Sequence, residues 1–230
     1  NGKPYKTSGG TMVWNEELQK EIPKGWKNGK LEDLKLSTLG GDWGKDEPID
    51  NYIKEVFCIR GADIPLSSKG QKGDIPIRFI LEKNISNRGL EINDIVIEIS
   101  GGSPTQSTGR SLFVTNDFLK YLDKPVICSN FCRVIKPKIE YGAFLFSTIK
   151  NLYNAGVLFT YENSSNGVKN LALEDLFIEE KLVIPKMPTI LSYNNIFSKI
   201  FKYINKLGME LETITELKDL LLSKMASVEN

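Results

Sequence analysis

The sequence predicts an α+β protein, in which a mixed, mostly antiparallel sheet or open barrel is followed by a long C-terminal coiled-coil helix. Two observations lead to this prediction. Residues 56–135 contain short β-branched and aromatic runs interrupted by Gly, Asn, Asp and Pro, which is typical of strands joined by turns. From about residue 192, apolar residues recur at heptad spacing and charged residues fill the other positions, as in a helix that pairs with a second helix.

The individual elements follow from where these runs begin and end. We expect an entry arm over residues 1–30 and helices at Tyr141–Ala155 and Leu173–Phe177, where the apolar spacing changes to a helical period. The expected strands are Val56–Ile59, Ile75–Leu81, Leu90–Ile99, Ser111–Thr115, Val126–Ser129, Phe131–Ile135 and Lys181–Pro185.

The long helix is expected from about Ser192 to about Ala226. Its apolar seam is Phe197, Ile200, Ile204, Leu207, Leu211 and Ile214, continued by Leu217, Leu221 and Met225 after a small slip of phase. The seam could pack on the chain's own domain, but a pattern of more than four heptads favours a partner helix. That partner would come from another half of the protein or from a second copy of the chain.

Composition limits the kinds of partner. The formal net charge is +1, from 30 basic and 29 acidic side chains, whereas a non-specific nucleic-acid binder is usually far more basic. Any basic surface must therefore be local, or be completed by other subunits. The three cysteines argue against a disulfide framework and for a reducing compartment, so we expect a cytoplasmic protein. No apolar run approaches the roughly 20 residues that span a bilayer.

Catalytic signals are lacking in the sequence. Histidine is absent, which removes the commonest general base, the Ser-His-Asp and Cys-His systems and most zinc sites. No phosphate-binding loop, dinucleotide fingerprint or amino-methyltransferase signature is present. Glu179-Glu180-Lys181 resembles part of a nuclease motif but is more commonly a charged turn, and Cys128 and Cys132 are expected to be buried structural thiols. We therefore predict no catalytic residue, metal or cofactor.

Two polar loops are candidates for binding nucleic acid. "SSKGQKG" covers residues 67–73, and "SGGSPTQSTGR" covers residues 100–110. The stretch from Lys54 to Arg88 contains seven basic side chains against four acidic ones. Hydroxyl, amide and guanidinium groups read base edges and hold phosphates, although Gly, Ser and Thr are also ordinary turn residues and a basic loop can be merely solvated. We predict DNA contacts from Lys69, Lys72, Arg78, Ser103, Thr105, Gln106, Thr108 and Arg110. Among these, Gln106 and Arg110 are base-edge candidates, and Lys69, Lys72 and Arg78 are phosphate candidates.

Several segments of the sequence resemble parts of one protein family. "NGKPYKTSGGTMVWNEELQKEIPKGWKNGKLEDL", with its Pro23-Lys24-Gly25-Trp26 step, is similar to the linker that opens a target-recognition domain in the specificity subunits of type I restriction–modification systems. "NDIVIEISGGSPTQSTGR" resembles the strand and loop of one variety of these domains. "NSSNGVKNLALEDLFIEEKLVIPKMP" and "LLLSKMASVEN" resemble the exit segment and the end of the family's long helix. The stretch Met187-Pro188-Thr189-Ile190 departs from the usual start of that helix.

The resemblance implies a target-recognition domain over residues 1–187 and a spacer helix over residues 188–230, similar to the carboxyl-terminal half of a specificity subunit. It implies a chain that reads one half of a split site in double-stranded DNA and docks methyltransferase subunits and, through them, the restriction subunit. It also implies that the chain itself is not an enzyme. A protein–protein adaptor without DNA readout, or the recognition domain of a fused single-chain restriction–modification enzyme, remain alternatives.

Overall fold

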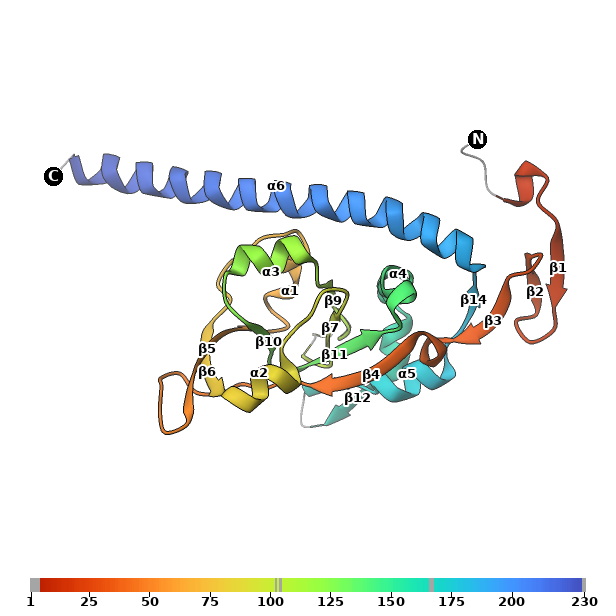
Figure 1. Ribbon diagram of the computed structural model, residues 1–230, viewed down its shortest axis with the longest axis horizontal. Helices are drawn as coiled ribbons and strands as arrows, with labels where there is room; N and C mark the ends of the chain where they lie inside the picture. The colour runs from red at the N-terminus through yellow and green to blue at the C-terminus, as the bar shows by residue number, and fades with distance from the viewer. Residues whose placement is uncertain (1–4, 102, 104, 166–167, 229–230) are drawn as a thin grey trace.

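The computed structural model describes residues 5–101, 103, 105–165 and 168–228. Over these residues the chain forms an α+β domain of short, mostly antiparallel sheets and one long C-terminal helix, and the sheets do not close into a barrel (Figure 1). This arrangement confirms the fold class predicted from the sequence.

A four-stranded antiparallel sheet lies at the centre of the domain. Its strand order is β4 (Lys35–Gly40), β11 (Cys132–Pro137), β7 (Ile95–Glu98) and β9 (Ser111–Phe113). Every residue of β7 is buried, because both faces of this sheet are covered. Ile95 and Ile97 pack into one hydrophobic core, and Val96 packs into a second core on the opposite face. Glu98 ends β7 on the same face as Val96.

The second core is closed by a three-stranded sheet and two short helices, α1 (Ile64–Ser67) and α3 (Asn116–Leu122). The strands are β5 (Tyr52–Ile59), β6 (Ile77–Leu81) and β10 (Val126–Cys128). A third helix, α2 (Glu82–Arg88), packs through Ile85 on a smaller core formed by Val56, Cys58, Ile80 and Ile127. β5 and β10 are parallel, since the chain passes through the central sheet before it returns as β10.

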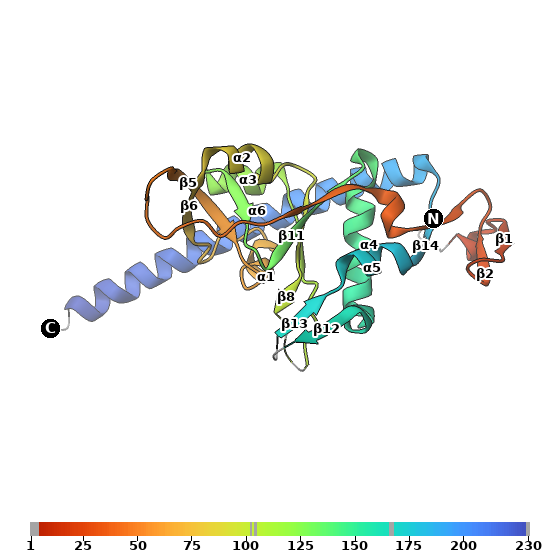
Figure 2. The same cartoon turned by 90° about the horizontal axis from the view of Figure 1, so that it is seen from below.

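The first core lies on the other face, under helices. These elements are η2 (Leu31–Leu34), η3 (Ile139–Tyr141), α4 (Gly142–Asn154), η4 (Val157–Tyr161) and α5 (Leu173–Glu179). A three-stranded sheet of β12 (Glu162–Ser165), β13 (Val168–Leu171) and β8 (Ser100–Gly101) lies at one edge of the molecule (Figure 2). Loop 100–110 therefore starts from this edge.

The expected strand Leu90–Ile99 is shorter in the structure because a turn occupies its first half. Asn93 has a φ of 80°, in the left-handed region, and the buried Asp94 carboxylate accepts a hydrogen bond from the Glu91 N–H at 2.8 Å. An Asp side chain that bonds a nearby backbone group competes with strand pairing, so β7 begins only at Ile95.

The entry arm leads into the domain through a hairpin. After η1 (Lys6–Ser8), β1 (Met12–Asn15) pairs with β2 (Lys20–Pro23), and the hairpin projects from the domain (Figure 1). β3 (Lys27–Lys30) then pairs with β14 (Lys181–Ile184), so the entry and exit of the domain lie side by side.

The long helix α6 runs from Met187 to Val228, about 63 Å at 1.5 Å per residue. It begins five residues before the expected Ser192. Pro188 is compatible with this start because the first turn of a helix does not use its backbone N–H groups. α6 crosses α4, passes over α3 and extends past the domain (Figure 1).

Candidate nucleic-acid interface

One face of α6 packs on its own domain. Phe197 is 7% exposed, and its ring lies 5.0 Å from that of Phe113, edge to face, and 4.1 Å from that of Phe201. Further along, the buried Asn205 donates a hydrogen bond of 2.8 Å to the hydroxyl of Thr115, which also caps α3. Phe197 thus belongs to the domain-facing side, and its assignment to the partner seam is wrong.

The rest of the apolar pattern lies on other faces of α6. Ile204 is half-buried, and the remaining seam residues are more than 50% exposed: Ile200, Leu207, Leu211, Ile214, Leu217, Leu221 and Met225. Tyr203 is 69% exposed and falls between Ile200 and Leu207. The six steps from Ile200 to Leu221 through Tyr203 cover 21 residues, which is the 3.5-residue period of a left-handed coiled coil. One face of α6 therefore packs on the domain, and pairing of the exposed stripe with a second helix stays a prediction.

Loop 67–73 is fixed against α6. The Glu212 carboxylate accepts hydrogen bonds from the N–H groups of Lys72 at 2.8 Å and Gly73 at 2.6 Å. It also accepts one of 2.8 Å from the Tyr121 hydroxyl, and burial together with this bond raises the pKa of Tyr121 to about 12. A Cβ on Gly208 would lie 2.0 Å from the Lys69 carbonyl oxygen, so loop and helix touch through backbone atoms.

The basic side chains of this region differ in exposure. Lys69 is exposed, whereas Lys72 is half-buried with its Nζ 4.7 Å from the centre of the Phe57 ring. Arg78 is 4% exposed, forms an ion pair with Asp46, donates to the Trp43 carbonyl at 2.8 Å and stacks on the Trp43 ring. Because its guanidinium is enclosed, Arg78 is not available for the phosphate contact expected from the sequence, and we remove it from the interface.

Loop 100–110 has an exposed tip and a buried return. The hydroxyl of Ser103 accepts from the N–H of Gln106 at 3.1 Å, and Thr105 and Gln106 are exposed. The Gln106 amide donates to the Tyr153 hydroxyl of α4 at 3.3 Å. Gly102 and Pro104 lie outside the described residues.

Thr108 is fully buried at the return of the same loop. Its N–H and hydroxyl both donate to one oxygen of the Glu162 carboxylate, at 2.6 and 3.0 Å, and Lys169 pairs with the other oxygen at 2.9 Å. Burial disfavours ionisation of Glu162, but the bonds from Lys169 and Thr108 outweigh it and lower its pKa. Thr108 therefore anchors the loop and is removed from the DNA contacts predicted from the sequence.

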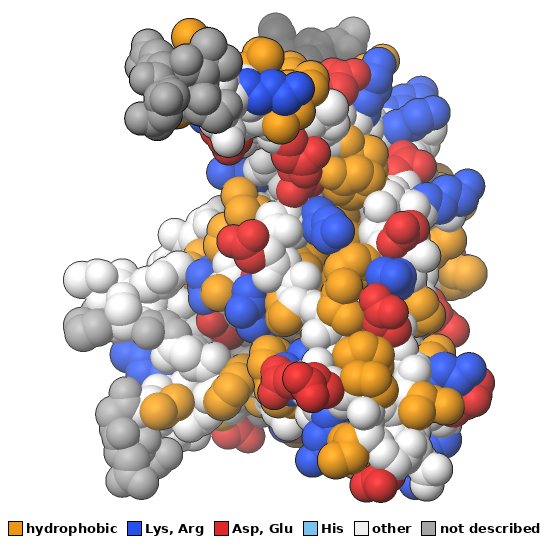
Figure 3. Space-filling model, turned by 90° about the vertical axis from the view of Figure 1, so that its left-hand side faces the viewer, with side chains coloured by type: hydrophobic (Ala, Val, Ile, Leu, Met, Phe, Trp, Pro, Cys, Tyr) orange, Lys and Arg blue, Asp and Glu red, His pale blue; other side chains and the backbone are white. Residues whose placement is uncertain are grey.

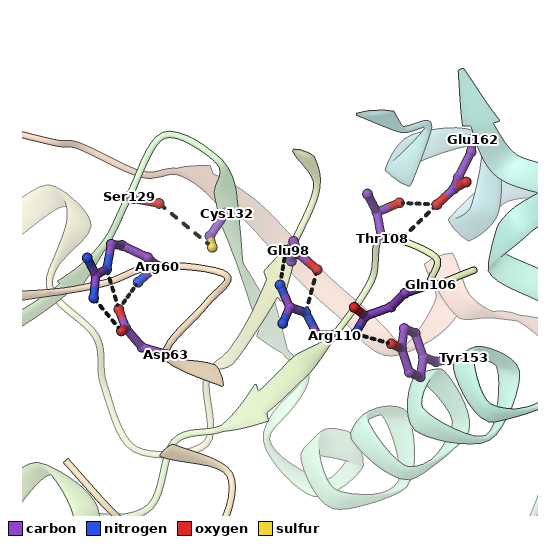
Figure 4. Close-up of polar contacts among 10 residues, drawn as sticks. All are labelled: Arg60, Asp63, Glu98, Gln106, Thr108, Arg110, Ser129, Cys132, Tyr153 and Glu162. Atoms are coloured by element: carbon purple, nitrogen blue, oxygen red, sulfur yellow. Dashed lines mark hydrogen bonds and ion pairs between the residues drawn. The ribbon is translucent and has the colours of Figure 1, made fainter. Parts of the chain in front are cut away.

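Arg110 ends the loop in a bidentate ion pair (Figure 4). Its Nε and Nη2 donate to the two Glu98 carboxylate oxygens, at 2.8 and 2.5 Å, and these bonds raise the pKa of Arg110. The Glu98 side chain is 3% exposed and that of Arg110 is 21% exposed. Gly61 and Gly101 leave room for the carboxylate, since a Cβ on either would lie within 3 Å of a Glu98 oxygen.

Arg110 lies between two hollows in the surface. One is a cleft of about 550 Å³ that we call the Arg60/Arg110 cleft, lined by Trp43, Arg60, Gly61, Ala62, Glu98, Ser100, Gly101, Arg110, Ser129, Asn130 and Phe131. The other is a hollow of about 250 Å³ whose lining includes Lys69, Lys150 and Tyr153. The structure thus brings Lys69, Gln106 and Arg110 into one region, although they come from loops far apart in sequence.

Sequence reasoning missed several residues of this region. Glu98 and Phe131 fall in runs that were predicted as strands, Trp43 lies in the loop between β4 and β5, and Lys150 lies on α4. Arg60 and Asp63, three residues apart, were a signal in the sequence for a paired arginine. The Asp63 carboxylate accepts hydrogen bonds from Arg60 Nε at 2.9 Å and from Arg60 Nη2 at 2.7 Å, as Glu98 does from Arg110.

Charged side chains of both signs alternate on the face drawn in Figure 3. The space-filling view shows Lys and Arg interspersed with Asp and Glu, with no broad patch of one sign on that face (Figure 3). Cys58, Cys128 and Cys132 are buried, as expected for structural thiols, and burial raises the thiol pKa of Cys58 and Cys132 to about 12. No helix within the described residues is long and apolar enough to cross a membrane.

Comparisons with known proteins find similarity in structure. No protein-family model and no curated protein match the sequence. The HsdS subunit from Thermoanaerobacter tengcongensis has 17% identity and a TM-score of 0.48, over 85% of this chain and 48% of that chain. The type I restriction–modification S subunit from M. genitalium has 15% identity and a TM-score of 0.46, over 85% and 42%.

A third structure concerns the assembly and conformational transition of the type I R-M system. It has 14% identity and a TM-score of 0.45, over 86% of this chain and 44% of that chain. The chain resembles these proteins in fold at low sequence identity, and it spans less than half of the length of each.

Proposed function

We propose that this chain is a DNA-recognition module of a type I restriction–modification complex, reading one half of a split site. One observation carries the proposal: a domain with polar surface loops is joined to a continuous 42-residue helix that leaves an apolar stripe exposed. This outward stripe consists of Ile200, Tyr203, Leu207, Leu211, Ile214, Leu217 and Leu221, and nothing in the described chain covers it. The entry, loop and exit phrases of the sequence support the same family.

The DNA-contacting residues in this proposal are the accessible ones of the two loops. Lys69 and Lys150 supply charge for phosphates, and Thr105, Gln106 and Arg110 supply hydrogen-bonding groups. Ser103 shapes the tip of loop 100–110. Lys72 contributes positive charge to the proposed DNA-binding surface through its ammonium group, which lies beside the Phe57 ring. The mixed surface charge is consistent with partner subunits that add phosphate contacts.

In the proposed complex, α6 sets the distance to a second recognition domain. The stripe from Ile200 to Leu221 would be covered by the corresponding helix of the other half of the subunit or of a second copy. Methyltransferase subunits, and the restriction subunit docked through them, would supply methyl transfer and cleavage. The chain itself would be non-catalytic.

Selection from random DNA duplexes tests this proposal. The chain is assembled with its methyltransferase subunit, and bound duplexes are recovered and sequenced at several salt concentrations. We expect two short conserved blocks separated by an unselected spacer, because two domains held at a fixed distance read two half-sites. Stable assembly with the methyltransferase but no enriched sequence would instead support a protein–protein adaptor.

A further inference from the structure

We propose that the Arg60/Arg110 cleft reads a guanine in the recognised DNA, with Arg110 as the specificity-determining residue and Glu98 as its positioning residue. This inference rests on the proposed DNA-recognition function and deepens it by naming the base. It concerns the base edge that carries O6 and N7, the two acceptors that an arginine fork binds in parallel.

Each arginine of the cleft is held by a carboxylate that keeps part of its donors free. A guanidinium has five N–H donors. Glu98 engages two of those on Arg110, through Nε and Nη2, and no other acceptor in the described chain engages the remaining three. Asp63 engages two on Arg60, and the Asp74 carbonyl accepts a third at 2.9 Å. Both residues therefore keep donors on their terminal nitrogens.

The carboxylates are rigid supports. The Glu98 and Asp63 side chains are 3% and 6% exposed, so each carboxylate is fixed by packing as well as by its arginine. Gly61 connects the two pairs, because it follows Arg60 in the chain and its backbone lies against Glu98. A fork held in a fixed plane loses little entropy on binding, which favours a directional contact.

Charge pairing favours a base over a phosphate. Arg110 with Glu98, and Arg60 with Asp63, are each neutral as a pair, so their net attraction for an anion is weak, while their remaining N–H groups still point in fixed directions. The O6 and N7 atoms of guanine are neutral acceptors that need direction more than charge. Arg78, by comparison, has no exposed face to offer.

Aromatic side chains form part of the walls of the cleft. Phe131 is 62% exposed and Trp43 is 36% exposed, and both line the cleft beside the arginines. Such walls exclude water from the hydrogen bonds that the arginine donors make with a base edge.

The test uses the assembled complex and the consensus duplex found by selection. Arg110→Lys keeps the charge but removes the fork, and we expect it to reduce the preference for guanine at one consensus position by roughly 5- to 150-fold. The slope of log affinity against log salt should stay unchanged, because no phosphate contact is lost. Arg133→Lys is the matched control: Arg133 contacts the carbonyls of Asn130 and Cys132 and does not line the cleft.

A modified base tests the contact at the level of atoms. Replacing the consensus guanine by 7-deazaguanine removes N7 and should weaken the wild-type complex but not the Arg110→Lys complex. Inosine keeps O6 and N7 and should bind the wild type normally. Equal weakening of both complexes by 7-deazaguanine, or an unchanged consensus in Arg110→Lys, would overturn the inference while leaving DNA recognition intact. A changed salt slope without a changed consensus would assign Arg110 to phosphate, and a wild type that selects no sequence would refute the proposed function itself.

Discussion

At the scale of single residues, the candidate interface is built on buried carboxylates. Glu98, Asp63 and Glu162 each accept two or more hydrogen bonds, and each fixes a loop or an arginine beside the surface. A buried ion pair adds little stability over an apolar pair of the same shape, but loss of one partner costs about 3–5 kcal/mol. We interpret these pairs as devices that position the surface groups.

Glu162 gives a prediction with a defined pH dependence. Its pKa in the folded state lies below the ordinary value of 4.5, so its stabilising contribution is present above pH 4.5 and is lost as the pH falls toward the folded-state pKa. Glu162→Gln should therefore lower the free energy of unfolding at pH 7, and the difference from wild type should shrink at pH 3. Urea denaturation at both pH values measures this.

The control for this experiment is Glu179→Gln on the exposed surface of α5, which should change stability by less than about 0.5 kcal/mol. A Glu162→Gln deficit of equal size at pH 3 and pH 7 would contradict an ionised anchor for Thr108.

Residue roles were predicted from the sequence less well than the elements that carry them. The composition of loop 100–110 pointed to hydrogen-bonding groups, and Gln106 and Thr105 are exposed. It could not show that Thr108 turns inward, because Glu162 lies 54 positions away. Arg78 was misjudged for the same reason: its partners Asp46 and Trp43 come from a distant loop. Such pairings depend on tertiary contacts that no local pattern encodes.

At the scale of elements, the contact between α6 and loop 67–73 determines the position of Lys69. Gly208 allows this contact, since a Cβ there would lie 2.0 Å from the Lys69 carbonyl oxygen. A Cβ on Gly70 would lie 2.5 Å from the Cα of Asn205. The loop therefore follows the helix instead of moving independently.

Gly208→Ala tests this contact. Alanine favours the helix by about 1 kcal/mol over glycine, yet the clash is with a backbone atom and cannot be relieved by a side-chain rotation. We expect a net destabilisation of about 1–3 kcal/mol, measured by urea denaturation. Ser198→Ala on the exposed surface of the same helix is the control and should be nearly neutral. A stabilised Gly208→Ala variant would contradict the close approach.

The helices α4, α5 and α6 were predicted close to their observed bounds because their apolar period is regular, whereas the short helices α1, α2 and α3 were not predicted from the sequence. The heptad spacing predicted α6, and in the structure the helix begins five residues before Ser192. Periodicity alone could not show that Phe197 faces the domain, because the domain-facing side of α6 and its outward stripe are both apolar. The strands are short, and turns such as that at Asn93 and Asp94 take up part of the apolar runs.

At the scale of the whole molecule, we propose that the outward stripe of α6 is the surface for a partner helix. Leu217→Glu with Leu221→Glu should abolish pairing without unfolding the domain, because both side chains are more than 50% exposed and lie beyond the contact at Glu212. Sedimentation velocity and assembly with the other half of the subunit measure the loss. Thr215→Glu with Ser223→Glu adds the same charge at exposed positions away from the stripe and is the control. Equal loss in both variants would contradict a specific seam.

The central claim is that this chain selects the DNA sequence that its complex modifies. Sequencing of DNA methylation in cells with the gene, without it, and with it restored tests the claim most directly. We predict a split motif that is methylated with the gene, unmethylated without it and methylated again on restoration. An identical methylation pattern in all three would contradict the account.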